Sequence, residues 1–295
     1  MNVSRESRPT LGAWIGIGFL TLLAILAVLG DRLWFVRSFD ERVRVDGDIA
    51  NQYGLGPGRT AWFGTDALGS DIFAKCLYGA RTTLVVGVLA TLVGLGLGCL
   101  LGIVAGYRRG ATDRFAGVVT DALLSTPAIV LAIVMIVKLE TVKETQTWLG
   151  WFDRRWQLTF TLGILTIAPI SRIVRARTLA LREADYVLAA RSLGATTSRI
   201  LRREVLPNLV PTMLTVAFTG LGLLVAAEAA LAFLGLSVEA PVPTWGKLID
   251  ENRNATSRAW WATFFPCLML FLTVLSFNLL GNHIARRFDI REAAL

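Results

Sequence analysis

The sequence alternates between long apolar stretches and shorter charged segments. A helix needs about 20 apolar residues to cross a hydrocarbon core about 30 Å thick. Six stretches approach or exceed that length, and the shortest has 16 residues. We therefore predict six transmembrane helices, which span Leu11–Leu29, Thr82–Tyr107, Phe115–Val137, Trp156–Ser171, Val205–Ala227 and Ala259–Ala285.

The composition agrees with a membrane protein built from helices. Hydrophobic residues make up 54% of the chain and charged residues only 18%, and the mean hydropathy is +0.57. A soluble domain carries about 25% charged residues. The first apolar stretch has 19 residues and no small-residue cleavage site after it, so we expect an uncleaved helix rather than a signal peptide. The predicted fold class is an all-α polytopic membrane protein.

The basic residues of the loops predict the orientation. With a cytoplasmic N-terminus, the four inside segments carry 16 Lys and Arg and a net charge of +9. The three outside segments are longer, yet carry 14 basic residues and a net charge of +1. Because cytoplasmic loops are enriched in Lys and Arg, we predict both termini inside, N-in/C-in. This asymmetry also accounts for the net charge of +8, so we expect no nucleic acid among the partners.

Four glycines spaced four residues apart mark the second span. Residues at this spacing lie on one face of a helix, and glycine lets a neighbouring backbone come close. The string lacks GxGxxG and follows no strand, so a nucleotide loop is the weaker interpretation. We predict a helix-packing face formed by Gly94, Gly98, Gly102 and Gly106.

Two acidic residues lie inside predicted spans. An intramembrane acid is a functional candidate by default. Asp121 stands one to two turns inside the third span, where capping or pairing near the membrane boundary is the preferred alternative. Glu228 stands at the end of the fifth span. Pro127 interrupts the third span and is expected to kink it.

Two outside segments have some helical character. Thr65 or Asp66 is a possible N-cap for a helix from about Ala67 to Tyr78, which we expect to lie in the membrane interface. After Glu228, the prolines at 241 and 243 favour a re-entrant or surface segment. We divide the chain into residues 1–81 (first span, outer segment and interfacial helix), 82–285 (core of five spans) and 286–295 (cytoplasmic tail).

The inside loop 172–208 contains a regular pattern. Leu181, Val187, Leu193, Ile200 and Val205 recur at helical spacing, and Gly194 offers a chain reversal between them. The pattern predicts a short helix pair suited to a groove of a partner protein. A basic loop that only fixes topology would explain the arginines. It would not explain the spacing of Ala189-Ala190, Gly194 and Leu206-Pro207.

This spacing resembles the EAA loop of type I ABC importer permeases. Three further strings are similar to the C-type permease subunit of dipeptide and oligopeptide importers, namely FGTDALGSDIFAKCLYGARTTLVVG (63–87), FLGLSVEAPVPTWGKLI (233–249) and LTVLSFNLLGN (272–282). Leu188 replaces the usual glutamate of the loop, and Glu204 replaces the usual isoleucine before Leu-Pro. The resemblance implies that the loop docks on an ATPase, with Glu183 and Asp185 as the candidate acidic contacts.

The resemblance also implies a division of labour. The chain has no GxxxxGK[ST] motif, so ATP and Mg²⁺ are expected on partner ATPase subunits and no cofactor in this chain. The expected partners are a homologous second permease, one or two ABC ATPases, an external substrate-binding protein and the lipid bilayer of the bacterial inner membrane. Peptides are the expected substrate; nickel, glutathione and antimicrobial peptides are the alternatives.

Other functional classes remain as alternatives. Secondary transporters and channels usually keep polar or charged groups near the membrane midplane. Here only two acids qualify, and both lie near span ends. One histidine allows no Ser/His/Asp set, and the three cysteines lack metal-ligand spacing. We therefore expect neither enzymatic activity nor a metal site, and keep a secondary transporter or channel as the alternative.

Overall fold

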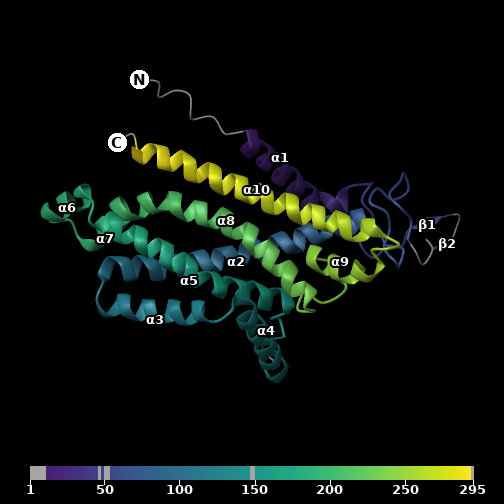
Figure 1. The fold of residues 1–295 in the computed structure, drawn as a ribbon, viewed down its shortest axis with the longest axis horizontal. Helices are drawn as coiled ribbons and strands as arrows, with labels where there is room; N and C mark the ends of the chain where they lie inside the picture. Colours follow the sequence, from purple (N-terminus) through teal and green to yellow (C-terminus); the bar gives the residue numbers. More distant parts are fainter. Residues whose placement is uncertain (1–10, 46–47, 50–53, 147–149, 294–295) are drawn as a thin grey trace.

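Long helices running side by side make up most of the computed structural model, which describes residues 11–45, 48–49, 54–146 and 150–293 (Figure 1). The helices are α1 (Leu11–Leu29), α2 (Ile72–Arg108), α3 (Ala111–Ser125), α4 (Ala128–Thr145), α5 (Arg154–Arg182), α6 (Asp185–Ser192), α7 (Thr197–Ile200), α8 (Leu206–Phe233), α9 (Trp245–Asn252) and α10 (Trp260–Ala293). The shorter elements are η1 (Gly30–Arg32), β1 (Arg44–Val45), β2 (Asp48–Ile49), the π-turn η3 (Leu201–Val205) and η4 (Arg253–Ala255).

Within these residues, five helical segments are long and apolar enough to cross a membrane. They comprise α1, α2, α5, α10 and the segment that runs from α7 into α8. The bent pair of α3 and α4 supplies a sixth if it is counted as one span. The prediction of a helical polytopic membrane protein is confirmed. The described residues also contain the two-residue antiparallel pairing of β1 with β2 and two isolated β-bridges.

The third predicted span is broken rather than kinked. Thr126 has an extended backbone (ψ 133°), as the residue before a proline prefers, and Pro127 stands at the N-cap of α4. The axes of α3 and α4 differ by 94°. Figure 1 shows α3 alongside α5, while α4 projects from the bundle.

The predicted interfacial helix is wrong. Asp66 does not cap a helix, because its side chain accepts the N–H groups of Leu68 and Ser70 (both 2.9 Å) within a turn. Asp71 is the N-cap instead and accepts from the N–H of Phe73 at 2.8 Å. The helix therefore begins at Ile72 and runs on without a break through the second span. The predicted boundary between residues 81 and 82 therefore falls inside α2. The predicted boundary at residue 286 falls inside α10, which continues to Ala293.

A close seam between α2 and α5 forms the centre of the bundle. A Cβ added at Gly98 would lie 2.9 Å from the Cβ of Ile170, and one added at Gly102 would lie 2.9 Å from the Cβ of Val174. Gly106 approaches the carbonyl oxygen of Arg175 in the same way. Only glycine leaves room for this approach. The seam residues on α2 are Gly94, Gly98, Gly102 and Gly106, and Gly163 approaches from α5.

The segment after Glu228 packs into the protein. Helix α8 continues past this residue to Phe233, and a loop then leads to α9. Trp245 and Leu248 of α9 are buried, and the indole Nε1 of Trp245 donates to the carbonyl oxygen of Cys76 at 2.9 Å. Of the two alternatives, re-entrant or surface, the surface segment is therefore wrong for α9. Its contacts with α2, α8 and α10 bury one face of the short helix.

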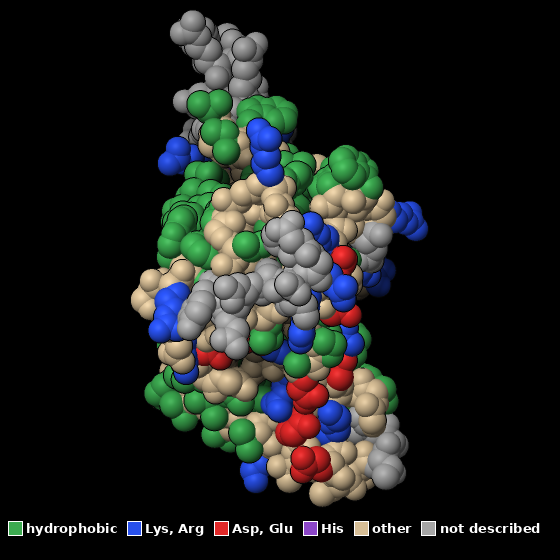
Figure 2. Space-filling model, turned by 90° about the vertical axis from the view of Figure 1, so that its right-hand side faces the viewer, with side chains coloured by type: hydrophobic (Ala, Val, Ile, Leu, Met, Phe, Trp, Pro, Cys, Tyr) green, Lys and Arg blue, Asp and Glu red, His purple; other side chains and the backbone are tan. Residues whose placement is uncertain are grey.

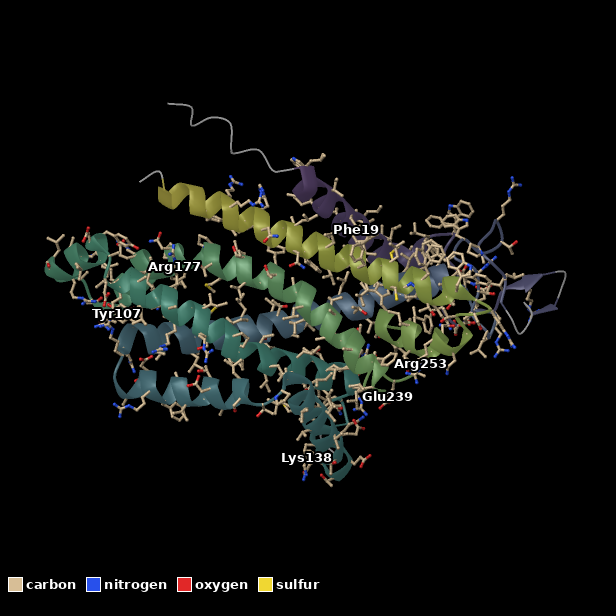
Figure 3. The ribbon with its side chains drawn as sticks, in the orientation of Figure 1. Phe19, Tyr107, Lys138, Arg177, Glu239 and Arg253 are labelled. Carbon is tan, nitrogen blue, oxygen red and sulfur yellow. The ribbon has the colours of Figure 1, made fainter. Side chains whose placement is uncertain are left out.

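The bundle has two distinct ends. We call the end that carries α6 and α7 the α6 end, and the opposite end, with α9 and the described residues between α1 and α2, the α9 end (Figure 1). In Figure 3, Tyr107 and Arg177 lie toward the α6 end, whereas Glu239 and Arg253 lie at the α9 end. Helix α1 begins, and α10 ends, on the side toward the α6 end. Figure 2 looks onto the α9 end and shows acidic and basic side chains interspersed there.

Candidate functional site

Helices α6 and α7 form a short hairpin at the α6 end, which we call the α6–α7 hairpin. Asp185 lies in the first turn of α6, where a carboxylate is favoured by the helix dipole. Gly194 turns the chain with φ +79°, and its N–H donates to the carbonyl oxygen of Arg191 at 3.0 Å. The hydroxyl of Thr196 then caps α7 by accepting from the N–H of Arg199 at 3.4 Å. The reversal needs glycine, because other residues rarely adopt this φ.

A buried apolar cluster attaches the hairpin to the long helices. Val187 of α6, Ile200 of α7 and Val205 of η3 are each 1% exposed or less. They pack with Val174 of α5 and Leu209 of α8. The hairpin is therefore packed directly against α5 and α8, without an intervening flexible segment.

The exposed surface of the hairpin includes apolar residues among its charged ones. Leu193 is 89% exposed and Leu188 is 44% exposed, while Ala189 and Gly194 are also exposed and Ala190 is half-buried. Neighbouring apolar groups left in solvent are typical of a surface that a partner covers. Leu206 and Pro207 form the exposed first turn of α8, next to the hairpin in sequence.

The two candidate acidic contacts have different surroundings. Glu183 caps the end of α5, and its carboxylate forms an ion pair with the guanidinium of Arg109 from the α2–α3 turn. Asp185 is exposed. The carboxylate of Asp185 is therefore the more accessible of the two for contact with a partner protein.

Two polar residues hold α6 against α8, and the sequence analysis did not single them out. The side-chain amide of Asn208 donates to the carbonyl oxygen of Glu204 at 2.6 Å and to the hydroxyl of Tyr186 at 3.4 Å. Burial, and then the neighbouring Glu204, raises the pKa of the Tyr186 hydroxyl, so this residue stays neutral. Only the position of Asn208 directly after Leu206-Pro207 could have indicated this contact.

Asp121 is paired. Its carboxylate accepts from the Arg172 guanidinium at 2.7 Å, and both side chains are more than half exposed. A second pair, Asp113 with Arg175 (2.8 Å between Oδ2 and Nη2), lies further along the same two helices. Together the pairs join α3 to α5, which matches the pairing alternative for Asp121.

Glu228 is buried at the α9 end, with 1% of its surface exposed. Its Oε1 accepts from the hydroxyl of Ser237 at 3.2 Å, and that hydroxyl lies 3.1 Å from the hydroxyl of Thr244. Thr244 in turn caps α9 by accepting from the N–H of Lys247 at 3.2 Å. Glu228 thus ties α8 to the loop that leads into α9. Among the described residues its Oε2 has no hydrogen-bond partner.

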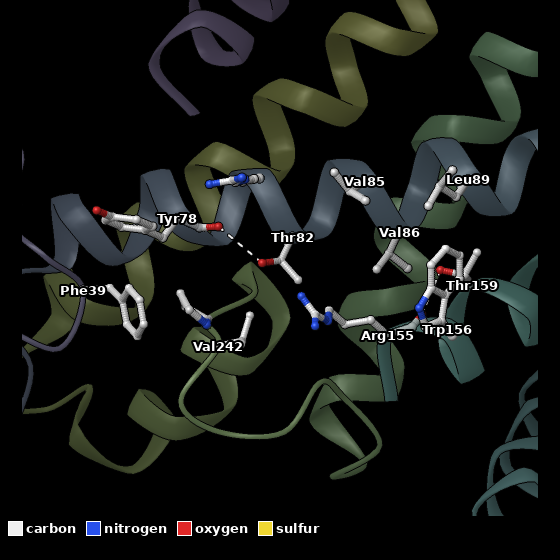
Figure 4. Close-up of a pocket in the computed structure, with 12 residues that line it drawn as sticks. Phe39, Tyr78, Thr82, Val85, Val86, Leu89, Arg155, Trp156, Thr159 and Val242 are labelled. Carbon is white, nitrogen blue, oxygen red and sulfur yellow. Dashed lines mark hydrogen bonds between the residues drawn. The ribbon is translucent and has the colours of Figure 1, made fainter. Parts of the chain in front are cut away.

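A cavity of about 480 Å³ opens at the α9 end between α2, the start of α5 and the loop before α9 (Figure 4). The three parts come from distant stretches of sequence. Side chains of Thr82, Arg155 and Val242 meet across it. No group of three or more possible metal ligands occurs in the part of the chain that the structure describes.

Comparison with known proteins identifies relatives along most of the chain. Residues 98–290 match the model of the family described as binding-protein-dependent transport system inner membrane component. The glutathione transport system permease protein GsiD of Pectobacterium atrosepticum is 33% identical over 90% of this chain and 84% of its own length. The dipeptide transport system permease protein DppC of Bacillus subtilis is 32% identical over 94% of this chain and 81% of its own length.

Solved structures share the fold. A chain from an amino acid ABC transporter crystallised with histidines aligns with a TM-score of 0.54 at 18% identity, covering 73% of this chain and 94% of that one. A chain of the MetNI methionine ABC transporter, in an inward-facing conformation, aligns with a TM-score of 0.55 at 21% identity, covering 72% and 93%. The chain therefore belongs to the binding-protein-dependent transport system inner membrane components and is a permease of the type I ABC importers.

Proposed function

We propose that this permease imports di- and oligopeptides across the bacterial inner membrane with energy supplied by partner ATPases. The exposed apolar side of the α6–α7 hairpin, with Leu193 at its tip, carries the proposal, because it is the surface on which an ATPase can act. In this arrangement the chain hydrolyses nothing itself. ATP and Mg²⁺ bind to one or two ABC ATPase subunits, and the α6 end faces the cytoplasm.

The hairpin converts ATPase movement into movement of the spans. Closure of two ATPases on ATP pulls the α6–α7 hairpins of this chain and of a homologous second permease toward each other. Buried Val187 passes this displacement to α5 and α8, and the glycine seam carries α2 along with α5. ATP binding thereby shifts the equilibrium between two conformations of the spans, because ATP binds better to one of these states than to the other.

The names of the relatives support peptides as the substrate. One is named for dipeptide and the other for glutathione, which is itself a tripeptide. An external binding protein would deliver the peptide at the α9 end. The path would then run between this chain and the second permease, along spans that contain few charged groups.

Purification from native membranes in a mild detergent, with mass spectrometry of the proteins that accompany the chain, tests the proposal. The expected result is a complex with one or two ATPases that contain Walker motifs and a second permease of similar length. A chain that purifies alone or only with itself, while remaining folded, would contradict the importer assignment and favour a self-sufficient carrier.

The substrate is tested separately by uptake into proteoliposomes that contain the purified complex and its binding protein. We expect ATP-dependent uptake of radiolabelled dipeptides. Uptake of Ni²⁺ but not of any peptide would refute the peptide assignment and leave the importer assignment intact.

A further inference from the structure

The cavity at the α9 end begins where the glycine seam ends. Between Gly94 and Gly106, helix α2 lies directly against α5. Closer to the α9 end, α2 carries larger residues such as Val85 and Leu89, which line the cavity, while Val86 still packs against Leu158 and Leu162 of α5. The loop containing Val242 and Pro243 covers part of the gap, and the remaining space is the cavity of about 480 Å³. A cavity of 300–1,000 Å³ is the usual size of a small-molecule site.

The wall of this cavity combines apolar surface with positive charge. Aliphatic side chains line the part next to α2, and the rings of Phe39, Tyr78 and Trp156 line its sides. Two arginines, Arg81 and Arg155, also line it, and none of the lining residues that the structure describes is acidic. Such a wall favours a ligand that has an anionic group beside an apolar or aromatic group.

Arg155 is held in position by the start of its own helix. Asp153 caps α5 by accepting from the N–H of Arg155 at 3.0 Å, and its other carboxylate oxygen accepts from the Nη2 of Arg155 at 2.7 Å and from its Nε at 3.0 Å. These two hydrogen bonds fix the guanidinium plane. Nη1 forms no hydrogen bond to the residues that the structure describes. Figure 4 shows the guanidinium pointing toward Thr82 and the middle of the cavity.

We propose that this cavity is a transient site for the C-terminal carboxylate of an incoming peptide, with Nη1 of Arg155 facing the carboxylate and the aromatic wall facing the last side chain. The assignment rests on the proposed function. A cation is disfavoured, because the guanidinium of Arg155 points into the cavity and none of the lining residues that the structure describes is acidic. The site lies at the end opposite the α6–α7 hairpin, where a peptide enters if the ATPases act on that hairpin. Asp153 competes for the same guanidinium and so keeps binding weak, which suits a substrate that must move on.

Photo-crosslinking distinguishes this site from other surfaces. The probe is the dipeptide alanyl-p-benzoylphenylalanine, compared with its C-terminal amide, on the purified ATPase-containing complex in nanodiscs of phosphatidylcholine. We expect the free acid to label the stretches 78–89 and 155–160 about three- to tenfold more than the amide, the preference expected of a partly exposed charge-assisted hydrogen bond. Arg155→Gln should remove this preference and Arg155→Lys should retain part of it.

Arg253→Gln is the matched control. Arg253 lies at the same end, stacks on the ring of Phe233 and does not line the cavity, so its loss should leave the preference unchanged. Equal labelling by acid and amide in the wild type, or a preference that survives Arg155→Gln, would overturn the proposal while ATP-dependent peptide uptake stands. Absence of uptake of any peptide by the wild-type complex would overturn both the site and the proposed function.

A lipid headgroup is the competing anion. Nanodiscs that also contain phosphatidylglycerol test it, with native mass spectrometry of bound lipid. Under the proposal, labelling by the free acid is the same with and without this lipid. Retention of phosphatidylglycerol by the wild type but not by Arg155→Gln, together with loss of labelling, would overturn the peptide assignment.

Discussion

The glycine seam can be tested by adding one methyl group at Gly98. In Gly98→Ala the new Cβ would lie 2.9 Å from the Cβ and Cγ2 of Ile170 and 3.0 Å from the carbonyl oxygen of Ile167. Carbon atoms prefer about 3.5–4.0 Å, so α2 and α5 must separate by several tenths of an ångström. Overpacking of this kind costs about 1–3 kcal/mol.

Gly96 provides the matched control on the same helix. It is exposed, and no atom lies within 4 Å of a Cβ added there. Replacing either glycine by alanine raises the helix propensity by the same amount, about 1 kcal/mol. The difference in stability between the two variants therefore reports the packing of α2 against α5 alone. At about 2–4 °C per kcal/mol, Gly98→Ala should melt about 2–12 °C below Gly96→Ala when the purified complex is heated and followed by tryptophan fluorescence. Equal melting temperatures, or a higher one for Gly98→Ala, would refute close packing at this position.

The other predictions concern the two ends of the bundle. Gly194→Pro should insert and assemble normally but lose peptide uptake, because proline cannot adopt φ +79°. Gly220→Ala, at a position that also has open space, should retain uptake. Normal uptake by the Gly194→Pro variant would contradict a coupling role of the hairpin. Glu228→Gln should keep the hydrogen bond from Ser237 and melt near the wild type. Glu228→Ala should lower the free energy of unfolding by about 1–3 kcal/mol. Equal melting temperatures of the Gln and Ala variants would show that the side chain at this position does not hold the loop. Asp121→Asn should change the melting temperature by less than about 2 °C, since its ion pair is largely exposed; a large loss would show that the pair is shielded in the membrane.

Features set by local spacing were predictable from the sequence. An interruption at Pro127 follows from the missing N–H of proline and the preference of the residue before it, but the sequence predicted a kink, and the 94° break depends on how α3 packs against α5. The reversal at Gly194 follows from a glycine between two amphipathic segments. The spacing of the glycines in α2 indicated one helix face, but their partner helix became known only from the structure.

Features decided by competing or distant contacts were not predictable. By residue type, Asp66 and Asp71 could each cap a helix. In the structure the side chain of Asp66 is used in a turn, and Asp71 is the N-cap of α2. Helix α9 has eight residues, too few for a clear periodic pattern, and its contacts with α2, α8 and α10 stabilise it. The cavity joins four distant segments, so no single stretch of sequence could indicate it.

The seam between α2 and α5 also has a mechanical consequence. Gly94 and Gly106 are twelve residues apart, so the helices are in backbone contact over about 18 Å of their length. The side chains that α5 brings to this contact, Thr166, Ile170, Val174 and Thr178, are all branched at Cβ and have few rotamers, so the pair should resist bending. The hairpin lies at one end of this pair and the cavity at the other. A small rotation applied at the hairpin would therefore be carried along the pair to the surroundings of Thr82 and Trp156 rather than absorbed between the two helices.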